Sequence, residues 1–205
     1  MYIPEFYKNN NIDEVKSFIV ENSFGIMVSQ VDNKIVATHI PLLLSKNKSG
    51  EDVLLGHISK ANQQLKNSDP ENEILVIFNG PHTYISSSWY DHENVPTWNY
   101  IAVHIYGKLR IIEGEELLSA MDMLVNKFEA GSEHPVSIKK MSPDYLHQHL
   151  KGIRGFEIKI ERIEAAKKLS QNRDDKNHKK IIEELEKKND PQANEVAAQM
   201  KKTRP

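Results

Sequence analysis

Residues 78–107, FNGPHTYISSSWYDHENVPTWNYIAVHIYG, decide our interpretation of the fold. This stretch holds both tryptophans and seven of the chain's fifteen aromatic residues, but only two formally charged side chains, Asp91 and Glu93. A long run with so little charge and so much ring surface is typical of a segment that is buried or that binds a ligand. We interpret it as the floor of a binding site.

Turn-forming residues divide this stretch into two extended ends and a central loop. Gly80-Pro81, Ser86-Ser87-Ser88 and Val95-Pro96 are the kind of residues that separate strands. Large flat side chains beside small hydroxyls suit a planar, partly polar ligand. The alternative is that these rings bind no ligand and are ordinary residues of a core and a barrel rim. The rings in question are those of Tyr84, Trp89, Trp98, Tyr100 and Tyr106.

The sequence on either side of this stretch predicts a sheet. Asp32-Asn33 is a tight-turn pair between two runs rich in β-branched residues, so residues 24–31 and 34–40 are expected to form a hairpin. Pro41 cannot donate to a ladder, which indicates an edge, a bulge or a kink at that point. Further strands are expected at residues 42–44, 53–58, 73–79, 82–86, 98–112 and 155–161.

Helices are expected where apolar residues recur at helical spacing. Residues 11–22 and 115–129 show this pattern, and Ser142-Pro143 begins a further helix with serine at the cap and proline at the first position. A short helix is expected to follow the strand at 53–58, over residues 59–64.

The composition changes towards the end of the chain. No aromatic residue follows Phe156, and one narrow apolar stripe, Ile181, Ile182 and Leu185, lies among lysines and glutamates. We therefore expect the core to end here, with residues 1–163 as the barrel domain and residues 164–205 as a charged helical extension. Pro191 separates two helices in this extension, which either pack on a partner or stay loosely ordered.

Length and composition narrow the class of protein. The 205 residues suffice for one domain with a sizeable core and some appendages, which we expect, or for two small domains. With 39% hydrophobic residues, 27% charged residues and a formal charge of -2, the composition shows no basic excess that would indicate a nucleic-acid binder. The absence of cysteine excludes disulfides, thiolate metal sites and cysteine nucleophiles, so a reducing cytoplasm is expected. No signal peptide and no apolar run of ~18 residues is evident, so no membrane association is expected.

Four histidines, His39, His57, His82 and His104, fall in or beside expected strands. They are either metal ligands or histidines that hydrogen-bond in the core or to a ligand. No His-Glu-x-x-His pair and no cysteine supports a metal, so we expect none. Serine hydrolase chemistry is disfavoured because the serine run lies in no Gly-x-Ser-x-Gly elbow.

A phosphate site is a stronger hypothesis. In Gly56-His57-Ile58-Ser59-Lys60-Ala61-Asn62, a strand end leads into a helix start, where backbone donors, a hydroxyl and a lysine can meet an anion. An ordinary helix cap with a solvated lysine explains the same residues equally well. No Gly-x-Gly-x-x-Gly or Walker sequence occurs, which argues against dinucleotide and triphosphate sites.

Several segments, taken together, resemble the PaiB-like proteins of the FMN-binding split-barrel group. The segments span nearly the whole chain in the family's order. They are Ala37-Thr38-His39-Ile40-Pro41-Leu42, Gly56 to Asn62, Gly80 to Ser86 with Ser88-Trp89-Tyr90, Val95 to Tyr100 with Ala102-Val103-His104 and Gly107, and Lys168-Leu169-Ser170-Gln171-Asn172-Arg173.

The resemblance implies a mainly β fold with flanking helices (α+β). It implies a six-stranded FMN-binding split barrel of Greek-key character with C-terminal helices. The family forms homodimers that bind FMN, or a similar planar phosphate-bearing ligand, in clefts between the two subunits.

The resemblance also implies a set of cofactor-binding residues. The isoalloxazine ring is expected beside Thr38, His39 and Ile40, and the phosphate end beside His57, Ser59, Lys60 and Asn62. The rest of the pocket is expected from Tyr84, Ser86, Ser88 and Trp89, with Trp98 and Asn99 of the same or the second subunit. The residues expected to fold back over the ligand are Lys168, Ser170, Gln171 and Asn172.

The chain departs from the family pattern at two positions. Gln63 and Ser87 stand where proline is expected. Neither change removes a ligand-binding group, although residues 86–90 are expected to be less rigid.

The resemblance implies a negative transcriptional regulator, a repressor of sporulation and degradative-enzyme synthesis in spore-forming bacteria. Direct DNA contact is not supported by the residues, because no helix-turn-helix is evident and the C-terminal lysines alternate with glutamates. We therefore expect a flavoprotein that regulates through its ligand. The alternative is an FMN-dependent oxidoreductase acting on a small substrate, and the sequence does not choose between them.

Overall fold

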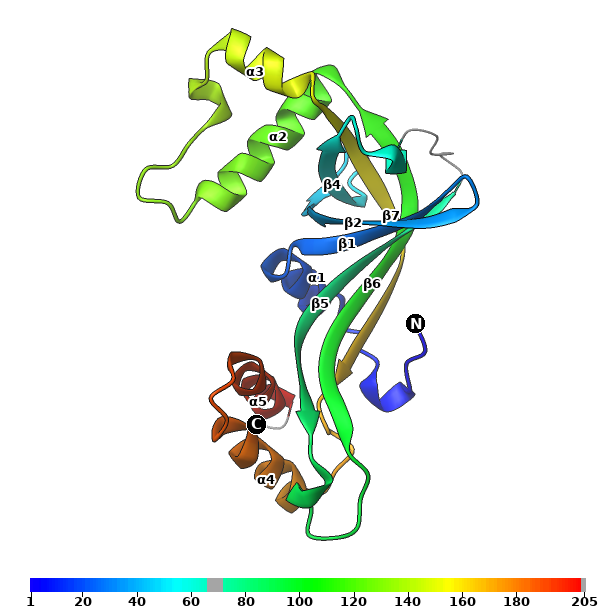
Figure 1. Cartoon of the computed structure of the whole chain (residues 1–205), viewed down its shortest axis with the longest axis vertical. Coiled ribbons are helices and arrows are strands. Elements are labelled where there is room, and N and C mark those ends of the chain that lie inside the picture. Colours follow the sequence, from blue (N-terminus) through cyan, green and yellow to red (C-terminus); the bar gives the residue numbers. More distant parts are fainter. Residues whose placement is uncertain (66–71, 204–205) are drawn as a thin grey trace. The chain divides into compact units, whose positions relative to one another are not determined.

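The computed structural model describes residues 1–65 and 72–203, and its sheet has seven strands. These are β1 (Phe24–Val31), β2 (Lys34–Pro41), β3 (Leu43–Lys46), β4 (Asp52–Ser59), β5 (Glu73–Ile85), β6 (Thr97–Ile112) and β7 (Ile153–Lys168). Their order in the sheet is β2-β1-β5-β6-β7-β4-β3 (Figure 1). The predicted class, a mainly β split barrel with flanking helices, is confirmed, with seven strands instead of the six expected.

In the described residues, five α-helices and four single 3-10 turns accompany these strands. The α-helices are α1 (Ile12–Glu21), α2 (Gly114–Glu129), α3 (Pro143–Leu150), α4 (Asp175–Glu186) and α5 (Pro191–Thr203). The 3-10 turns are η1 (Glu5–Tyr7), η2 (Gln63–Leu65), η3 (Ser87–Trp89) and η4 (Ile138–Lys140). Within the described residues, no helix is both long and apolar enough to cross a membrane.

The hairpin of β1 and β2 forms where the sequence predicts it. Asp32 and Asn33 adopt positive φ angles of 49° and 62°, and Val31 pairs with Lys34 across the turn. Two left-handed residues match the twist of the flanking strands, and asparagine and aspartate tolerate that conformation better than other side chains with a Cβ. Because β2 is an outer strand of the sheet, Pro41 at its end is tolerated.

The expected break at Gly80-Pro81 does not exist, since residues 73–85 form the single strand β5. A Cβ at position 80 would lie 2.6 Å from the ring of Phe18. Glycine at this position therefore allows an aromatic side chain to approach the strand, and it does not mark a turn.

Another glycine fixes a close contact inside β6. A Cβ at Gly107 would lie 1.9 Å from the backbone oxygen of Lys159. No side chain fits at that distance, so glycine is required where the β7 backbone passes. The last strand, expected over residues 155–161, is longer than predicted and covers residues 153–168.

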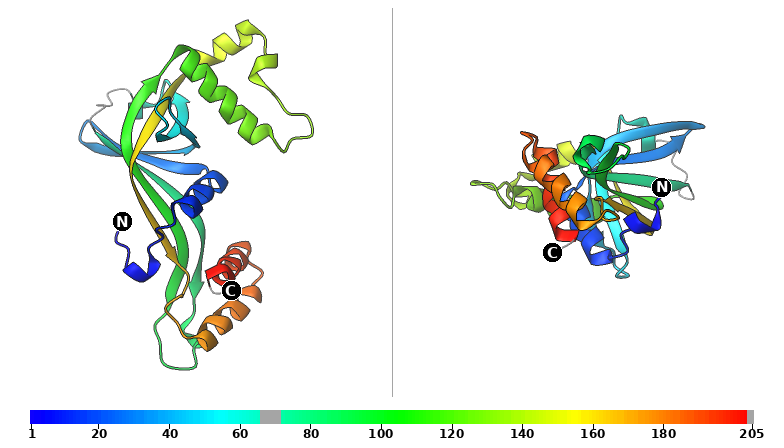
Figure 2. Two further views of the ribbon diagram at one scale, coloured as in Figure 1. Left: turned by 180° about the vertical axis from the view of Figure 1, so that it is seen from behind. Right: turned by 90° about the horizontal axis from the view of Figure 1, so that it is seen from below.

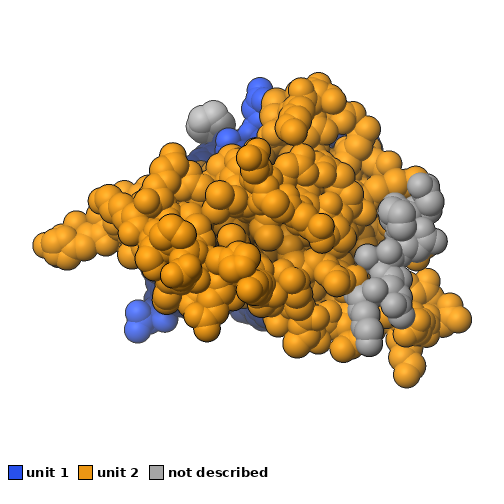
Figure 3. Space-filling model, turned by 90° about the horizontal axis from the view of Figure 1, so that it is seen from above, with its two compact units in different colours: residues 1–18, 79–104, 164–205 blue, residues 19–78, 105–163 orange. Residues whose placement is uncertain are grey.

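The chain packs into two compact units, coloured separately in Figure 3. Unit 1 comprises residues 1–18, 79–104 and 164–205, and unit 2 comprises residues 19–78 and 105–163. The long strands β5, β6 and β7 each contribute residues to both. The expected division at residue 163 stays a prediction.

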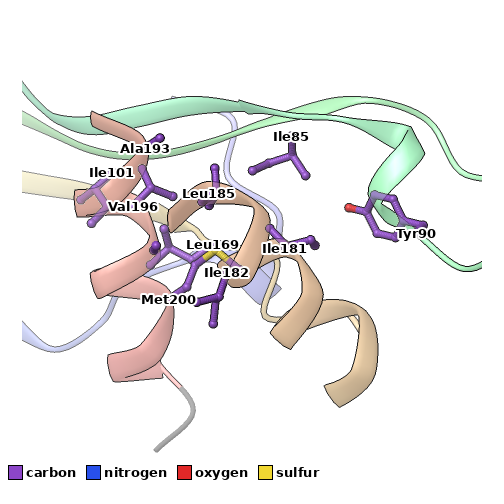
Figure 4. Packing of buried hydrophobic residues seen from close by; sticks show 11 residues of the cluster. Ile85, Tyr90, Ile101, Leu169, Ile181, Ile182, Leu185, Ala193, Val196 and Met200 are labelled. Atoms are coloured by element: carbon purple, nitrogen blue, oxygen red, sulfur yellow. The ribbon is translucent and has the colours of Figure 1, made fainter. Parts of the chain in front are cut away.

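The core of unit 1 includes the C-terminal helices, so the expectation that the core ends after Phe156 was wrong. Leu169, Ile181 and Leu185 are completely buried, in one cluster with Ile85 and Ile101. Figure 4 shows these side chains gathered beside α4 and α5, and these two helices lie against each other (Figure 2). The apolar stripe of α4, Ile181, Ile182 and Leu185, is thus buried in this core, although charged residues lie between its members in the sequence.

Unit 2 has its own core, in which α2 packs on the sheet. Leu117, Ala120 and Leu124 of the helix are buried with Val53 of β4 and Ile112 of β6. This arrangement is the amphipathic packing predicted for residues 115–129.

Candidate functional site

Two of the predicted ligand residues in unit 2 belong to a network around Gln64. Asn62 donates its side-chain amide to the Thr38 hydroxyl at 3.0 Å, and that hydroxyl hydrogen-bonds to Gln64. Gln64 is 1% exposed and donates to the backbone oxygen of Met27 at 3.0 Å. The network brings Thr38 and Asn62 together and fixes the turn after β4 to the hairpin of β1 and β2.

The neighbours of Thr38 on β2 differ in exposure. His39 is exposed, and its ring stacks on Phe24 at a centroid separation of 6.3 Å. Ile40 is 2% exposed. An exposed imidazole beside an aromatic ring offers a surface for a flat ligand, whereas Ile40 is part of the packing under it.

The strand end predicted to bind phosphate turns back on itself. The Asn62 N–H donates to the Ser59 backbone oxygen at 3.0 Å, and the Ala61 N–H donates to the Ser59 hydroxyl at 3.2 Å. The helix predicted over residues 59–64 does not form: Ser59 ends β4, residues 60–62 are not helical, and the described residues hold only the 3-10 turn Gln63–Leu65. These two amides are therefore already bonded within the turn.

His57 has an unsatisfied polar atom in this segment. Its Nδ1 is buried and has no hydrogen-bond partner among the described residues. Burial lowers the pKa of His57 below its ordinary value of 6.5, so the ring is neutral at pH 7. A buried donor or acceptor left unpaired is costly, and a ligand or water is the usual reason for it.

Lys60 lines a cavity of about 510 Å³ in unit 2. Its other polar walls are Lys151, Arg154 and His147, with Glu113 at the start of α2. None of the three walls from residues 147–154 was predicted. They lie about 90 residues further along the chain, and only the pairing of β4 with β7, which sets Ser59 opposite Ile153, brings them to Lys60.

The rings of unit 1 form an aromatic face on the sheet. Tyr84 and Trp98 are 41% and 53% exposed, and their rings meet edge to face at 6.1 Å. His82 lies 6.3 Å from the Trp98 ring. A cavity of about 420 Å³ on this face is lined by His82, Trp98, Tyr100 and His104. Tyr84 and Trp98 are therefore not core residues, and their part in binding a ligand stays a prediction.

The serine run is organised by its own hydrogen bonds. The Ser86 hydroxyl lies 2.8 Å from the Ser88 hydroxyl and accepts from the Ser88 N–H at 3.2 Å, which caps η3. Trp89 in this turn packs against the core of unit 1, with the Lys188 ammonium 4.9 Å from its ring centre. The C-terminal segment thus contacts the predicted pocket loop directly.

Asn99 and Ser170 pair with each other. Asn99 is completely buried, Ser170 is 4% exposed at a φ of 58°, and their side chains exchange hydrogen bonds of 3.0 and 3.1 Å. Gln171 donates to the Phe6 backbone oxygen at 2.9 Å. In this structure these three side chains use their polar groups to join the turn after β7 to the rest of unit 1.

Lys168 and Asn172 complete the predicted residues in this turn. Lys168 donates to the Thr97 hydroxyl, and its pKa is lowered by burial and then by the charge of Arg173. Asn172 is exposed. Among residues 1–65 and 72–203, no three histidine, aspartate or glutamate side chains are grouped as metal ligands.

These residues fit an anionic, flat ligand. Unit 2 provides a cationic cavity and the unpaired His57 nitrogen, which suit a phosphate-bearing group. Unit 1 provides an exposed aromatic face, which suits a planar ring. The fit holds for each unit separately.

Comparison with known proteins identifies related sequences and folds. Residues 1–162 match the model of a family described as "Putative FMN-binding domain", which agrees with the FMN predicted above. Over 200 residues the chain is 44% identical to the protease synthase and sporulation protein PAI 2 of Bacillus subtilis (strain 168). The match covers 98% of this chain and 96% of that protein.

Two solved structures share the fold. The flavocytochrome Anf3 from Azotobacter vinelandii has a TM-score of 0.60 at 13% identity, covering 82% of this chain and 72% of that one. The FAD and heme binding protein from Mycobacterium smegmatis has a TM-score of 0.58 at 12% identity, covering 79% and 73%. At these identities the likeness establishes the fold alone.

Proposed function

The chain belongs to the PaiB-like family of FMN-binding domains, and on this premise we propose that it binds FMN and acts as a negative regulator of sporulation and degradative-enzyme synthesis. The observation that carries this proposal is the 44% identity, over 98% of this chain, to a protease synthase and sporulation protein. FMN, when bound, supplies one- and two-electron transfer. The protein's own residues bind, orient and shield it.

In this proposal unit 2 holds the phosphate and one side of the ring. The Lys60 ammonium neutralises phosphate charge, and the exposed His39 ring lies beside Thr38 where the isoalloxazine is expected. His57 stays neutral because burial lowers its pKa, so its unpaired nitrogen can bond to the ligand without adding charge. The residues of unit 1 expected at the ligand remain a prediction from the resemblance.

The proposal includes a homodimer in the cytoplasm. Tyr84 and Trp98 form an exposed aromatic face that a second copy would cover, as large exposed apolar patches usually are. The cytoplasm is the compartment expected from the cysteine-free sequence. The regulatory effect is proposed to pass through the ligand and not through direct DNA contact.

One genetic experiment tests regulation through the ligand. Deleting the gene in its host is expected to raise extracellular protease activity and the frequency of sporulation, and the wild-type gene is expected to restore both. A Lys60→Ala variant that has lost FMN affinity is expected to fail, whereas Lys46→Ala restores repression. Full repression by the variant that cannot bind flavin would contradict the proposal.

A turnover assay separates the regulator from the alternative enzyme. FMN-loaded protein is mixed with reduced nicotinamide and an electron acceptor, and oxidation of the nicotinamide is followed by absorbance. A regulator binds FMN tightly and shows no steady turnover. Steady turnover would favour an FMN-dependent oxidoreductase.

A further inference from the structure

The part of β5 that lies in unit 1 has an open edge. In the sheet, β5 has β6 on one side and β1 on the other. β1 starts at Phe24 and pairs with β5 through Ile26 opposite Ile77, so this register reaches no further than residue 79. Residues 80–85 therefore have a partner strand on one side only. On the other side, their backbone N–H and C=O groups lie outside every ladder of the described chain.

The composition of this strand favours pairing with other strands. Residues 74–90 contain no aspartate, glutamate, lysine or arginine, so the strand has no charge of its own that would repel another copy. His82 and Tyr84, which alternate along one face of the strand, are both exposed. An uncharged, exposed edge associates with edges of other molecules unless something covers it.

Side chains from the C-terminal segment cover this open edge. The His82 N–H donates to Oε1 of Gln192 at 3.2 Å, and the Lys188 ammonium donates to the Tyr84 backbone oxygen at 3.4 Å. These two backbone groups point to the same side of the strand, because their residues are two positions apart. The Gly80 backbone oxygen lies 3.1 Å from Nδ1 of His82. Three groups that another strand would use are therefore bonded to side chains.

The core of unit 1 holds the two covering residues in place. The Lys188 N–H donates to the Leu185 backbone oxygen at 3.1 Å, just after α4 ends. Gln192 lies in the first turn of α5, where its N–H donates to the Asp190 carboxylate at 2.9 Å. Leu185 of α4 and Ala193 of α5 are completely buried in one cluster (Figure 4). Lys188 and Gln192 therefore reach the edge from helices that are packed against the core.

We propose that Lys188 and Gln192 form an edge cap, which stops the open edge of β5 from pairing with the same edge of a second copy. A second copy fits this edge because antiparallel pairing about a two-fold axis near His82 sets each N–H opposite a C=O. The cap lies beyond residue 162, outside the matched FMN-binding domain. This role of the C-terminal helices does not depend on flavin.

Sedimentation velocity of the full-length protein without flavin tests this inference. Replacing both cap residues, by Lys188→Ala and Gln192→Ala together, frees the edge, and the mass is expected to rise about twofold above that of wild type as the concentration increases. Lys188→Arg with Gln192→Glu keeps a donor and an acceptor and is expected to keep the wild-type mass. Lys202→Ala with Gln148→Ala is the matched control, because it removes the same groups from exposed sites of α5 and α3.

A lysine on the edge tests where the new contact forms. His82→Lys, added to the variant without the cap, sets two lysines face to face across the two-fold axis. It is expected to return the mass to that of the His82→Lys protein alone. A folded variant without the cap that keeps the wild-type mass at every concentration would overturn the proposal, and so would association that His82→Lys leaves in place.

Hydrogen exchange tests the cap in a protein with a single substitution. The His82 amide is expected to exchange about fivefold faster in Gln192→Ala than in wild type, because it loses its acceptor. The Leu169 amide, which donates to the Gln171 side chain in the same unit, is the internal control and is expected to keep its rate. An unchanged rate for His82 would show that Gln192 does not cap the edge.

Discussion

Leu185→Ala tests whether the C-terminal helices belong to the folded core of unit 1. Leu185 is completely buried in α4, in one cluster with Ile85, Ile101 and Leu169. Truncating a leucine at such a site removes the transfer free energy of its methyl groups and leaves a cavity, and the sum is about 3 kcal/mol. The free energy of unfolding of unit 1 is expected to fall by that amount.

Tryptophan fluorescence measures unit 1 selectively, because both tryptophans of the chain, Trp89 and Trp98, lie in it. The midpoint of urea unfolding followed by this signal is expected to decrease with an unchanged slope. Ile12→Ala is the control, because Ile12 lies in the same unit, is 49% exposed on α1, and its truncation should cost less than about 1 kcal/mol. An unchanged midpoint for Leu185→Ala would show that α4 is not part of the cooperative core.

Three further substitutions test the fold, the site and the dimer. Gly107→Ala places a Cβ 1.9 Å from the Lys159 backbone oxygen and is expected to cost about 2–3 kcal/mol in urea unfolding, whereas Gly131→Ala, with open space around it, is expected to be nearly neutral. Burial lowers the pKa of His57 below its ordinary value of 6.5 in the folded protein. Below about pH 6.5 the unfolded chain therefore binds a proton at His57 more readily than the folded chain does, and the free energy of unfolding falls as the pH drops below 6.5. His57→Gln is therefore expected to lose less stability than wild type between about pH 7.5 and pH 5.5, and equal losses would contradict the assignment. Sedimentation is expected to give a two-subunit mass for wild type and a larger monomer fraction for Trp98→Ser, and a monomeric wild type at micromolar concentration would contradict the dimer.

Local chemistry made much of the fold predictable. The β1 and β2 hairpin follows from Asp32-Asn33, because few other residues tolerate two successive left-handed conformations. The same local reasoning divided β5 at Gly80, where glycine serves a contact with Phe18 from a distant helix. Sequence punctuation does not show whether a glycine permits a turn or a close approach.

The burial of the C-terminal helices in the core of unit 1 was not predicted from the sequence. Their charged residues suggested a solvated extension, but Ala193 and Ala197 are completely buried along with the apolar stripe of α4. Alanines allow two helices to pack closely, but they add little to the periodic pattern of large apolar residues from which an amphipathic helix is predicted.

Only those residues of the candidate site that belong to short local motifs could be predicted from the sequence. Lys60 is noticed because it follows a strand, but Lys151 and Arg154 carry no local pattern that marks them. They reach Lys60 through the β4 and β7 pairing, a contact between residues about 90 positions apart. In contrast, Asn99 and Ser170 stood in family-like segments, and in the structure they bond to each other.

Calorimetric titration of the purified full-length protein with FMN tests the central claim most directly. The account predicts saturable heat with one FMN bound per chain and weaker binding of riboflavin, which lacks the phosphate that we propose binds Lys60. Absence of any heat of binding with either flavin, from protein that unfolds cooperatively and is therefore native, would contradict it.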